Sequence, residues 1–200
     1  MDNVAYLQTM WQTLWQQTPR LAPELAPIIA AYQQPQRHYH TTQHLRECLQ
    51  YWHTCQQAMP NAFAIGVALF YHDVVYEPQR QDNETQSVAW MHHHLQDALD
   101  PHTLQTIATL IMDTQNHQAS LGEISAWMLD IDLSILGANA RRFAEYEAQI
   151  RQEYRFVPAM LYRYRRRQVL QTLAQRSPLF QTPYFQQQLG AQAQINLSGL

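Results

Sequence analysis

The sequence predicts an all-α fold, a single-domain bundle of about eight to ten helices. Apolar residues recur at helical spacing through most of the chain, which is typical of amphipathic helices. The chain has only 5 glycines, too few for a fold built on tight β-turns, and its 10 prolines fall between the periodic segments. No segment of useful length alternates apolar and polar residues as a half-buried strand does.

Prolines and capping residues predict where the helices of the first half begin and end. We expect a helix over 4–17, a break at Pro19, Pro23 and Pro27, a short apolar helix before Pro35, and a helix from a cap at Thr41 or Thr42 to about residue 58. Pro60 suits the first turn of the next helix, which is apolar almost all round and is therefore expected to be central and buried. Asp82 or Asn83 caps the helix that follows, to about residue 99.

The second half of the chain follows the same pattern. We expect helices from Pro101 to about 116, from about 124 to 136 with Gly137 just past the end, from a cap at Asn139 to about 154, from Pro158 to about 176, and over 184–196. No internal repeat or linker interrupts this series. With 200 residues, of which 46% are hydrophobic, the chain is expected to form one domain over residues 1–200 with a buried core.

The composition excludes several classes of function. All 13 basic residues are arginine, so no lysine is present to form a Schiff base or to act in a phosphate-binding loop. A net charge of −3 does not favour binding to nucleic acid or to an anionic membrane. No apolar stretch approaches the roughly 20 residues of a membrane span, and the first residues lack the basic start and apolar run of a signal peptide.

The two cysteines, Cys48 and Cys55, lie on one predicted helix. A rise of about 1.5 Å per residue separates their backbones by roughly 10 Å, too far for a disulfide. Free thiols suit a reducing compartment, so we expect the protein to be cytoplasmic.

A small set of histidines and aspartates predicts a metal site. His72 and Asp73 end the most apolar segment of the chain, where a charged aspartate is costly unless it is paired or coordinated. His44 lies on the preceding predicted helix, and Asp132 lies on a much later apolar one. Three helices that offer these groups can surround one divalent cation, and mixed nitrogen and oxygen ligands suit Mn, Fe, Ni, Co, Zn or Mg.

The order of these residues resembles the signature of the HD superfamily of metal-dependent phosphohydrolases, and the flanking residues look like the small bacterial predicted HD phosphohydrolases. The resemblance covers about residues 6–197 and is carried by the segments Arg37-x-Tyr39-His40-Thr41-x-x-His44, His72-Asp73-x-x-Tyr76, Asn83-Glu84-x-x-Ser87, Thr114-x-x-His117, Asp130-x-Asp132-Leu133-Ser134-Ile135-Leu136-Gly137 and Ile150-Arg151-x-Glu153-Tyr154. A lone His-Asp pair would carry no weight, whereas this ordered set is specific.

The resemblance implies a compact HD-type helical bundle that holds a divalent metal ion. Its four ligands would be His44, His72, Asp73 and Asp132. The ion would polarise a phosphoryl oxygen and lower the pKa of a bound water, and Asp73 would also orient that water.

Further residues are candidates for proton transfer or for contact with the substrate. Those for proton transfer are Glu84 and His117, and those for substrate contact are Arg37, His40 and Asn83. Structural alternatives stay open: His40 caps or packs, Asn83 caps a helix, and Glu84 interacts with the helix dipole. Asp130 and Asp132 point about 200° apart on a helix, so only Asp132 is assigned to the ion, and Asp130 is expected to form an ion pair.

Two conspicuous patterns are expected to be structural. Three successive helical residues diverge by about 100° each, so they cannot converge on one ion; these are His92, His93 and His94. A basic run is expected to lie on solvated helix faces and to pair with Glu145, Glu147 or Glu153, with a phosphate or nucleic-acid site as the alternative; it comprises Arg163, Arg165, Arg166 and Arg167.

These features predict an enzyme, a divalent-metal-dependent phosphohydrolase that acts on a small phosphorylated metabolite or nucleotide through a metal-activated water. Two alternatives stay open, a non-catalytic metal or nucleotide sensor and a helical interaction protein on the same fold. The presence of both Glu84 and His117 favours the enzyme, because a degenerate binder is expected to lose such residues before the metal ligands.

Overall fold

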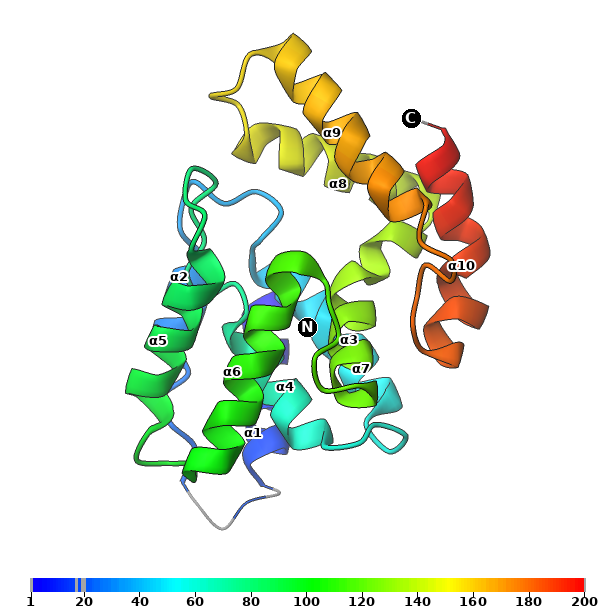
Figure 1. Cartoon of the computed structure of the whole chain (residues 1–200). Coiled ribbons are helices and arrows are strands. Elements are labelled where there is room, and N and C mark those ends of the chain that lie inside the picture. Colours follow the sequence, from blue (N-terminus) through cyan, green and yellow to red (C-terminus); the bar gives the residue numbers. More distant parts are fainter. Residues whose placement is uncertain (1, 17, 19–20, 200) are drawn as a thin grey trace.

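Ten α-helices and one short 3₁₀ helix make up the regular structure of the described residues, 2–16, 18 and 21–199, and no strand occurs among them (Figure 1). The structure is a computed structural model. In chain order the elements are α1 (Asn3–Trp15), α2 (Ala26–Tyr32), α3 (Thr42–Cys55), α4 (Ala62–Tyr71), α5 (Asn83–Leu95), α6 (Pro101–Asn116), α7 (Glu123–Asp132), the 3₁₀ helix η1 (Leu133–Gly137), α8 (Ala140–Glu153), α9 (Ala159–Ala174) and α10 (Pro183–Ser198). The predicted all-α fold is confirmed. The predicted end of the first helix at residue 17 and the break at Pro19 lie outside the described residues.

Capping residues and prolines set several helix ends where the sequence predicts them. Thr41 caps α3, because its side chain accepts a hydrogen bond from the backbone N–H of Gln43 at 3.3 Å. The side chain of Asn139 caps α8 through a 3.0 Å bond from the N–H of Arg142. Pro101 is the first residue of α6, as expected.

One of two other predicted helix starts differs from the structure. Pro60 lies before α4 and not in its first turn, because Asn61 is the capping residue of that helix. The proline and the polar cap are adjacent in sequence, so the pattern places this start only to within a residue or two. Asp82, one of the two candidate caps of α5, occupies the cap position as expected, although its side chain makes no capping hydrogen bond, and Asn83 is the first residue within the helix.

α4 is the centre of the bundle. Every residue from Ala64 to Tyr71 is buried, as expected for a helix that is apolar almost all round. α1, α3, α5, α6 and α7 all pack against it (Figure 1). The end of this buried helix therefore delivers His72 and Asp73 to the interior of the molecule.

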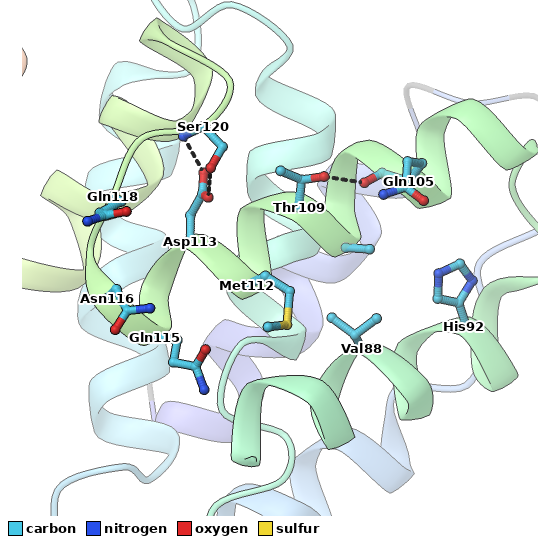
Figure 2. Close-up of a pocket in the computed structure, with 11 residues that line it drawn as sticks. Val88, His92, Gln105, Thr109, Met112, Asp113, Gln115, Asn116, Gln118 and Ser120 are labelled. Carbon is cyan, nitrogen blue, oxygen red and sulfur yellow. Dashed lines mark hydrogen bonds between the residues drawn. The ribbon is translucent and has the colours of Figure 1, made fainter. Parts of the chain in front are cut away.

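Two buried aspartates hold the loops that follow α6 and α9. Asp113 accepts hydrogen bonds from the backbone N–H (3.0 Å) and the hydroxyl (2.5 Å) of Ser120 (Figure 2). Asp130 accepts from the backbone N–H groups of Gln181 (2.9 Å) and Thr182 (2.7 Å). Backbone donors therefore take the place of the ion pair predicted for Asp130, because a loop distant in sequence folds back onto it.

Both cysteines are free and buried, as predicted. The Sγ atom of Cys48 lies 3.7 Å from Nδ1 of His44, one turn earlier on α3. None of the described helices is long and apolar enough to cross a membrane.

Gly137 permits a close contact between η1 and α10. The helix expected over 124–136 ends early, at Asp132, and the chain continues as η1, whose last residue is Gly137. A β-carbon built on Gly137 would lie 2.5 Å from Cβ of Leu189 on α10. Close packing, and not a left-handed turn past a helix end, is therefore the reason for glycine at this position.

Replacing Gly137 with alanine is expected to lower the free energy of unfolding by about 1–3 kcal/mol, because the added methyl group forces α10 away from η1. Urea denaturation measures this loss. Gly199→Ala is the control, since the nearest atom to its new β-carbon would be 3.7 Å away, and it should change stability little. Wild-type stability in Gly137→Ala would contradict the packing argument.

Candidate metal centre

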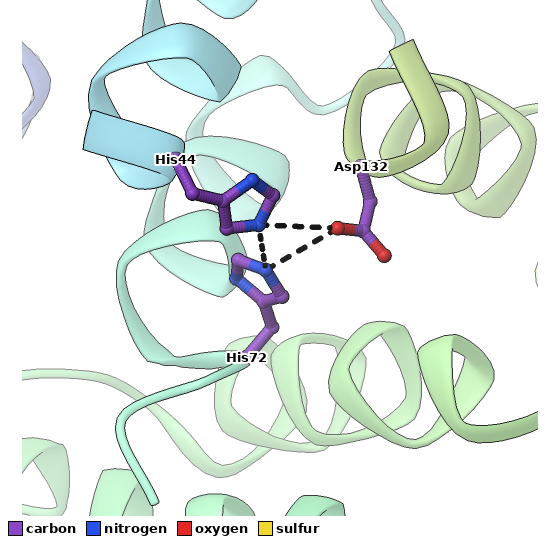
Figure 3. A group of neighbouring side chains, drawn as sticks. All are labelled: His44, His72 and Asp132. Atoms are coloured by element: carbon purple, nitrogen blue, oxygen red, sulfur yellow. Dashed lines mark hydrogen bonds and ion pairs between the residues drawn. The ribbon is translucent and has the colours of Figure 1, made fainter. Parts of the chain in front are cut away.

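Three helices bring distant histidines and an aspartate together (Figure 3). His44 lies in the first turn of α3, His72 directly follows α4, and Asp132 ends α7. The Nε2 atoms of His44 and His72 are 3.2 Å apart. Oδ1 of Asp132 lies 3.3 Å from Nε2 of His44 and 3.5 Å from Nε2 of His72. The three side chains therefore converge on one point.

Asp73 adds a second carboxylate to this group. Its Oδ2 atom lies 3.0 Å from Nε2 of His72 and 3.5 Å from Nε2 of His44. Its backbone is also fixed, because its carbonyl accepts a hydrogen bond from the Arg37 guanidinium at 2.6 Å and its N–H donates to the Tyr32 hydroxyl at 3.3 Å. The structure thus assembles all four predicted ligands, and we call His44, His72, Asp73 and Asp132 the His/Asp cluster.

The histidines of the cluster are more deeply buried than its aspartates, and a hydrogen bond fixes which ring nitrogen of His72 faces the other members. Nδ1 of His72 donates to the backbone carbonyl of Leu69 at 2.8 Å, so the free lone pair of the neutral ring is on Nε2. The side chains of His44 and His72 are only 2% exposed, whereas those of Asp73 and Asp132 are 18% and 16% exposed. Solvent therefore reaches the cluster from its carboxylate side.

The charges of the cluster depend strongly on one another. Burial opposes a positive charge on His44 and His72, yet acidic neighbours raise the pKa of each well above the usual histidine value. Burial likewise opposes a negative charge on Asp73 and Asp132, yet the imidazoles lower the pKa of each well below the usual carboxyl value. Two inward carboxylates thus require a positive charge between them, which a proton or a metal ion supplies.

The donor set fits a divalent metal ion. Two imidazole nitrogens and two carboxylate oxygens are ligands that Mn, Fe, Co, Ni and Zn accept. In the described part of the chain only histidines form ion pairs with Asp73 and Asp132, and no arginine does. Their negative charge is therefore available to a cation.

Glu153 anchors the loop in front of α3. Its Oε1 atom accepts hydrogen bonds from three consecutive backbone N–H groups, those of His38, Tyr39 and His40, at 2.8–3.0 Å. Its Oε2 atom accepts from the Tyr76 hydroxyl at 3.0 Å and bonds Nδ1 of His40 at 2.8 Å. The His40 ring also stacks on Tyr76, with centroids 3.9 Å apart. His40 was predicted either to contact substrate or to cap or pack within the protein, and these contacts are packing contacts.

Two residues predicted to contact substrate bond the protein backbone. Arg37 is 5% exposed, and its guanidinium donates to the carbonyls of His40 (3.2 Å), Asp73 (2.6 Å) and the residue after it (2.9 Å). Asn83 exchanges two hydrogen bonds with the backbone of Glu77, at 3.1 and 3.0 Å. Both side chains are thus satisfied within the protein and shape the loops on either side of the cluster.

Glu84 and His117 flank the cluster. Nε2 of His117 lies 3.7 Å from Oδ2 of Asp132, and His117 ends α6 in a left-handed conformation (φ 51°) that histidine tolerates better than most residues. Burial lowers the pKa of His117, which favours the neutral imidazole at neutral pH. Glu84 lies half-buried in the first turn of α5, where burial, with a contribution from Asp73, raises its pKa. His117 is therefore in contact with the cluster, and the charge of Glu84 is influenced by it.

The side chains of His92, His93 and His94 lie in three different environments. Nδ1 of His94 bonds the Tyr71 hydroxyl at 2.8 Å, and His93 is exposed. His92 lines a separate cavity of about 450 Å³ between α5 and α6 (Figure 2). The helix geometry thus separates these side chains, as the sequence predicts.

The basic run on α9 forms one of the predicted ion pairs, and its other members lie on exposed helix faces as expected. Arg166 pairs with Glu147 at 2.5 Å and lies over the ring of Tyr146. The other members are exposed, and these are Arg163, Arg165 and Arg167. Glu153, also named as a partner of this run, accepts hydrogen bonds from the loop before α3 instead.

Comparisons with family models, curated proteins and solved structures give no match to this chain. Function is therefore inferred from the geometry of the His/Asp cluster and from the motifs that it assembles.

Glu153 and Tyr76 belong to the sequence motifs, but the sequence predicted only an ion pair with the basic run for Glu153 and no role for Tyr76. One signal was present for Glu153: it lies on the buried stripe of α8, in register with Phe143, Tyr146 and Ile150. It also ends that helix, where the helix dipole disfavours a carboxylate. A carboxylate on an apolar stripe at a helix C-terminus indicates a buried acceptor that other donors must satisfy.

The contacts of Glu153 predict a pH dependence of stability. Although burial opposes it, His40 and the backbone donors lower the pKa of Glu153 from 4.5 to about 2. Because the pKa is lower in the folded state, this contribution is complete above about pH 4.5 and is lost as the pH falls toward 2. A shift of this size corresponds to about 3 kcal/mol.

Urea denaturation from pH 6 to 2 tests this, with Glu153→Gln as the comparison. The free energy of unfolding of the wild type should fall more steeply than that of the variant below about pH 4.5. Parallel curves would contradict the role of Glu153. If the variant does not fold, NMR titration of the Glu153 carboxyl carbon in the wild type gives the same answer.

Proposed function

We propose that this protein is a divalent-metal-dependent phosphohydrolase that acts on a small phosphorylated metabolite or nucleotide. The observation that carries the proposal is the convergence of two imidazoles and two carboxylates, unpaired with arginine, at the end of a buried helix. The resemblance of the ordered motifs to HD phosphohydrolases supports it. The free, buried thiols support a cytoplasmic location as part of the same proposal.

The His/Asp cluster would hold the ion through Nε2 of both histidines and one oxygen of each aspartate. When bound, a divalent ion supplies Lewis-acid chemistry, since it polarises a phosphoryl oxygen and lowers the pKa of a water molecule. The partial exposure of the Asp73 and Asp132 side chains, 18% and 16%, supports entry of substrate from that side.

The flanking residues would carry the proton transfers. Glu84, with its raised pKa, is suited to accept a proton from the attacking water and to return one. His117, neutral and next to Asp132, is suited to contact the leaving oxygen. Arg37 and Glu153 would act as positioning residues, because they fix the backbone of Asp73 and the loop in front of α3.

Elemental analysis of the purified protein is expected to give about one divalent ion per chain at near-neutral pH. The affinity should fall on acidification, because protons compete for the two histidines, whose pKa values are raised without metal. The double variant His92→Gln with His93→Gln, which changes two histidines of α5 outside the cluster, is the matched control and should keep its metal. Absence of binding at micromolar metal would contradict the proposed centre.

Two conservative variants separate metal binding from catalysis. Asp73→Asn removes a negative charge from the ligand set, so the metal should bind much more weakly. Glu84→Gln should keep the metal while turnover falls about 10²–10⁴-fold, the usual size of a general acid–base contribution. Metal content and hydrolysis are measured at saturating metal on a panel of phosphorylated metabolites and nucleotides.

The outcomes distinguish the competing functions. Full activity in Asp73→Asn would contradict the hydrolase mechanism. Loss of metal in Glu84→Gln would make Glu84 a ligand and favour a two-metal site. Metal binding by the wild type without turnover on the whole panel would favour the sensor.

A further inference from the structure

A second cavity, of about 510 Å³, opens between the end of α6 and the segment that joins α9 to α10. Its polar lining residues are Asn116, His117, Gln118, Arg176, Ser177 and Gln181. Among the described residues that line it, none is an aspartate or a glutamate, although the chain as a whole carries a net charge of −3. The cavity therefore combines a positive charge with neutral hydrogen-bonding groups.

His117 connects this cavity to the His/Asp cluster. It lines the cavity, and its Nε2 atom lies 3.7 Å from Oδ2 of Asp132. Asp130, two residues before Asp132, accepts hydrogen bonds from the backbone of Gln181, so the wall of the cavity is tied to the helix that carries a metal ligand. Arg176 thus lines the same cavity as His117, the imidazole that lies next to the cluster.

Arg176 differs from the other partly buried arginines of the chain. In the described part of the chain their guanidinium groups bond carboxylates, carbonyls or amide oxygens of the protein, and these residues are Arg37, Arg46, Arg142, Arg151 and Arg166. Arg176 is half-buried, but in the described part of the chain only its backbone N–H makes a hydrogen bond, to Leu173. Its side-chain donors are therefore available to a ligand in the cavity.

We propose that Arg176 is a specificity-determining residue that binds a phosphoryl group of the substrate in this cavity. The inference rests on the proposed function, because it gives the phosphorylated substrate a cationic contact beyond the metal centre. A guanidinium recognises phosphate oxygens through two parallel N–H donors, which fits a planar arginine and not a neutral amide. Asn116, Gln118 and Gln181 suit a polar, hydroxyl-bearing remainder of the ligand and not an apolar one.

Isothermal calorimetry with inorganic phosphate tests Arg176 on the full-length protein. Arg176→Gln is expected to weaken phosphate binding by about ten- to a hundredfold, as a charge-assisted hydrogen bond is lost. Arg176→Lys, which keeps the charge but not the two-donor geometry, should fall between that variant and the wild type. Arg167→Gln is the matched control, because it removes an exposed arginine from α9 without touching the cavity, and it should bind phosphate like the wild type.

A second readout uses turnover on any substrate found in the panel. Arg176→Gln should raise KM with little change in kcat, and its metal content should equal that of the wild type. Equal phosphate affinity in the wild type and Arg176→Gln, or no phosphate binding by either, would overturn the inference. If hydrolysis persists with those results, only the role of Arg176 fails. If metal and hydrolysis are absent while Arg176→Gln still loses phosphate, the proposed function fails and Arg176 remains an anion-binding residue.

Discussion

Five hydrogen bonds converge on the buried carboxylate of Glu153, and the geometry in front of α3 depends on them. One oxygen takes three consecutive backbone N–H groups, which fixes residues 38–40 just before the helix that carries His44. The other oxygen joins His40 to Tyr76, three residues after Asp73. A carboxylate buried without these donors would be costly, so the loop and the carboxylate stabilise each other.

The same interaction recurs at two other loops around the candidate centre. Asp113, four residues before His117, holds the turn at Ser120. Asp130, two residues before Asp132, holds the segment at Thr182. Each of these two aspartates lies within four residues of a candidate site residue, but neither is a predicted metal ligand. Buried acids that bind backbone groups therefore hold the loops around the His/Asp cluster, to which the proposed chemistry is assigned.

How much the sequence could predict depended on how local each feature is. The ends of α6 and the caps at Thr41 and Asn139 follow from residues within a turn of each other, and they were predicted. The members of the His/Asp cluster were also predicted, because His72, Asp73 and Asp132 lie in or directly after apolar helices where charge is otherwise costly, and because the order of the four residues resembles a known ligand set. Glu153 shares that signal, yet its donors lie more than a hundred residues away, and no spacing rule connects them.

Contacts between distant segments explain the remaining differences. Arg37 looked like a substrate contact from its motif, but the carbonyls that it reaches are brought to it by α4. Gly137 looked like a helix terminator, but α10, which packs against it, comes much later in the chain. Arg176 lies outside every motif. Its neighbours in the cavity, such as His117 from the end of α6, come from a distant part of the sequence.

The distribution of the cluster over α3, α4 and α7 has a consequence for biosynthesis. His44 and the His72–Asp73 pair emerge early from a ribosome, but Asp132 follows only after α5 and α6 have been made. A nascent chain that ends before α7 has both imidazoles and only one of the two carboxylates. The complete His/Asp cluster therefore cannot form until α7 has been synthesised, and an ion that bound to it, as proposed, would favour the finished bundle over partly synthesised chains.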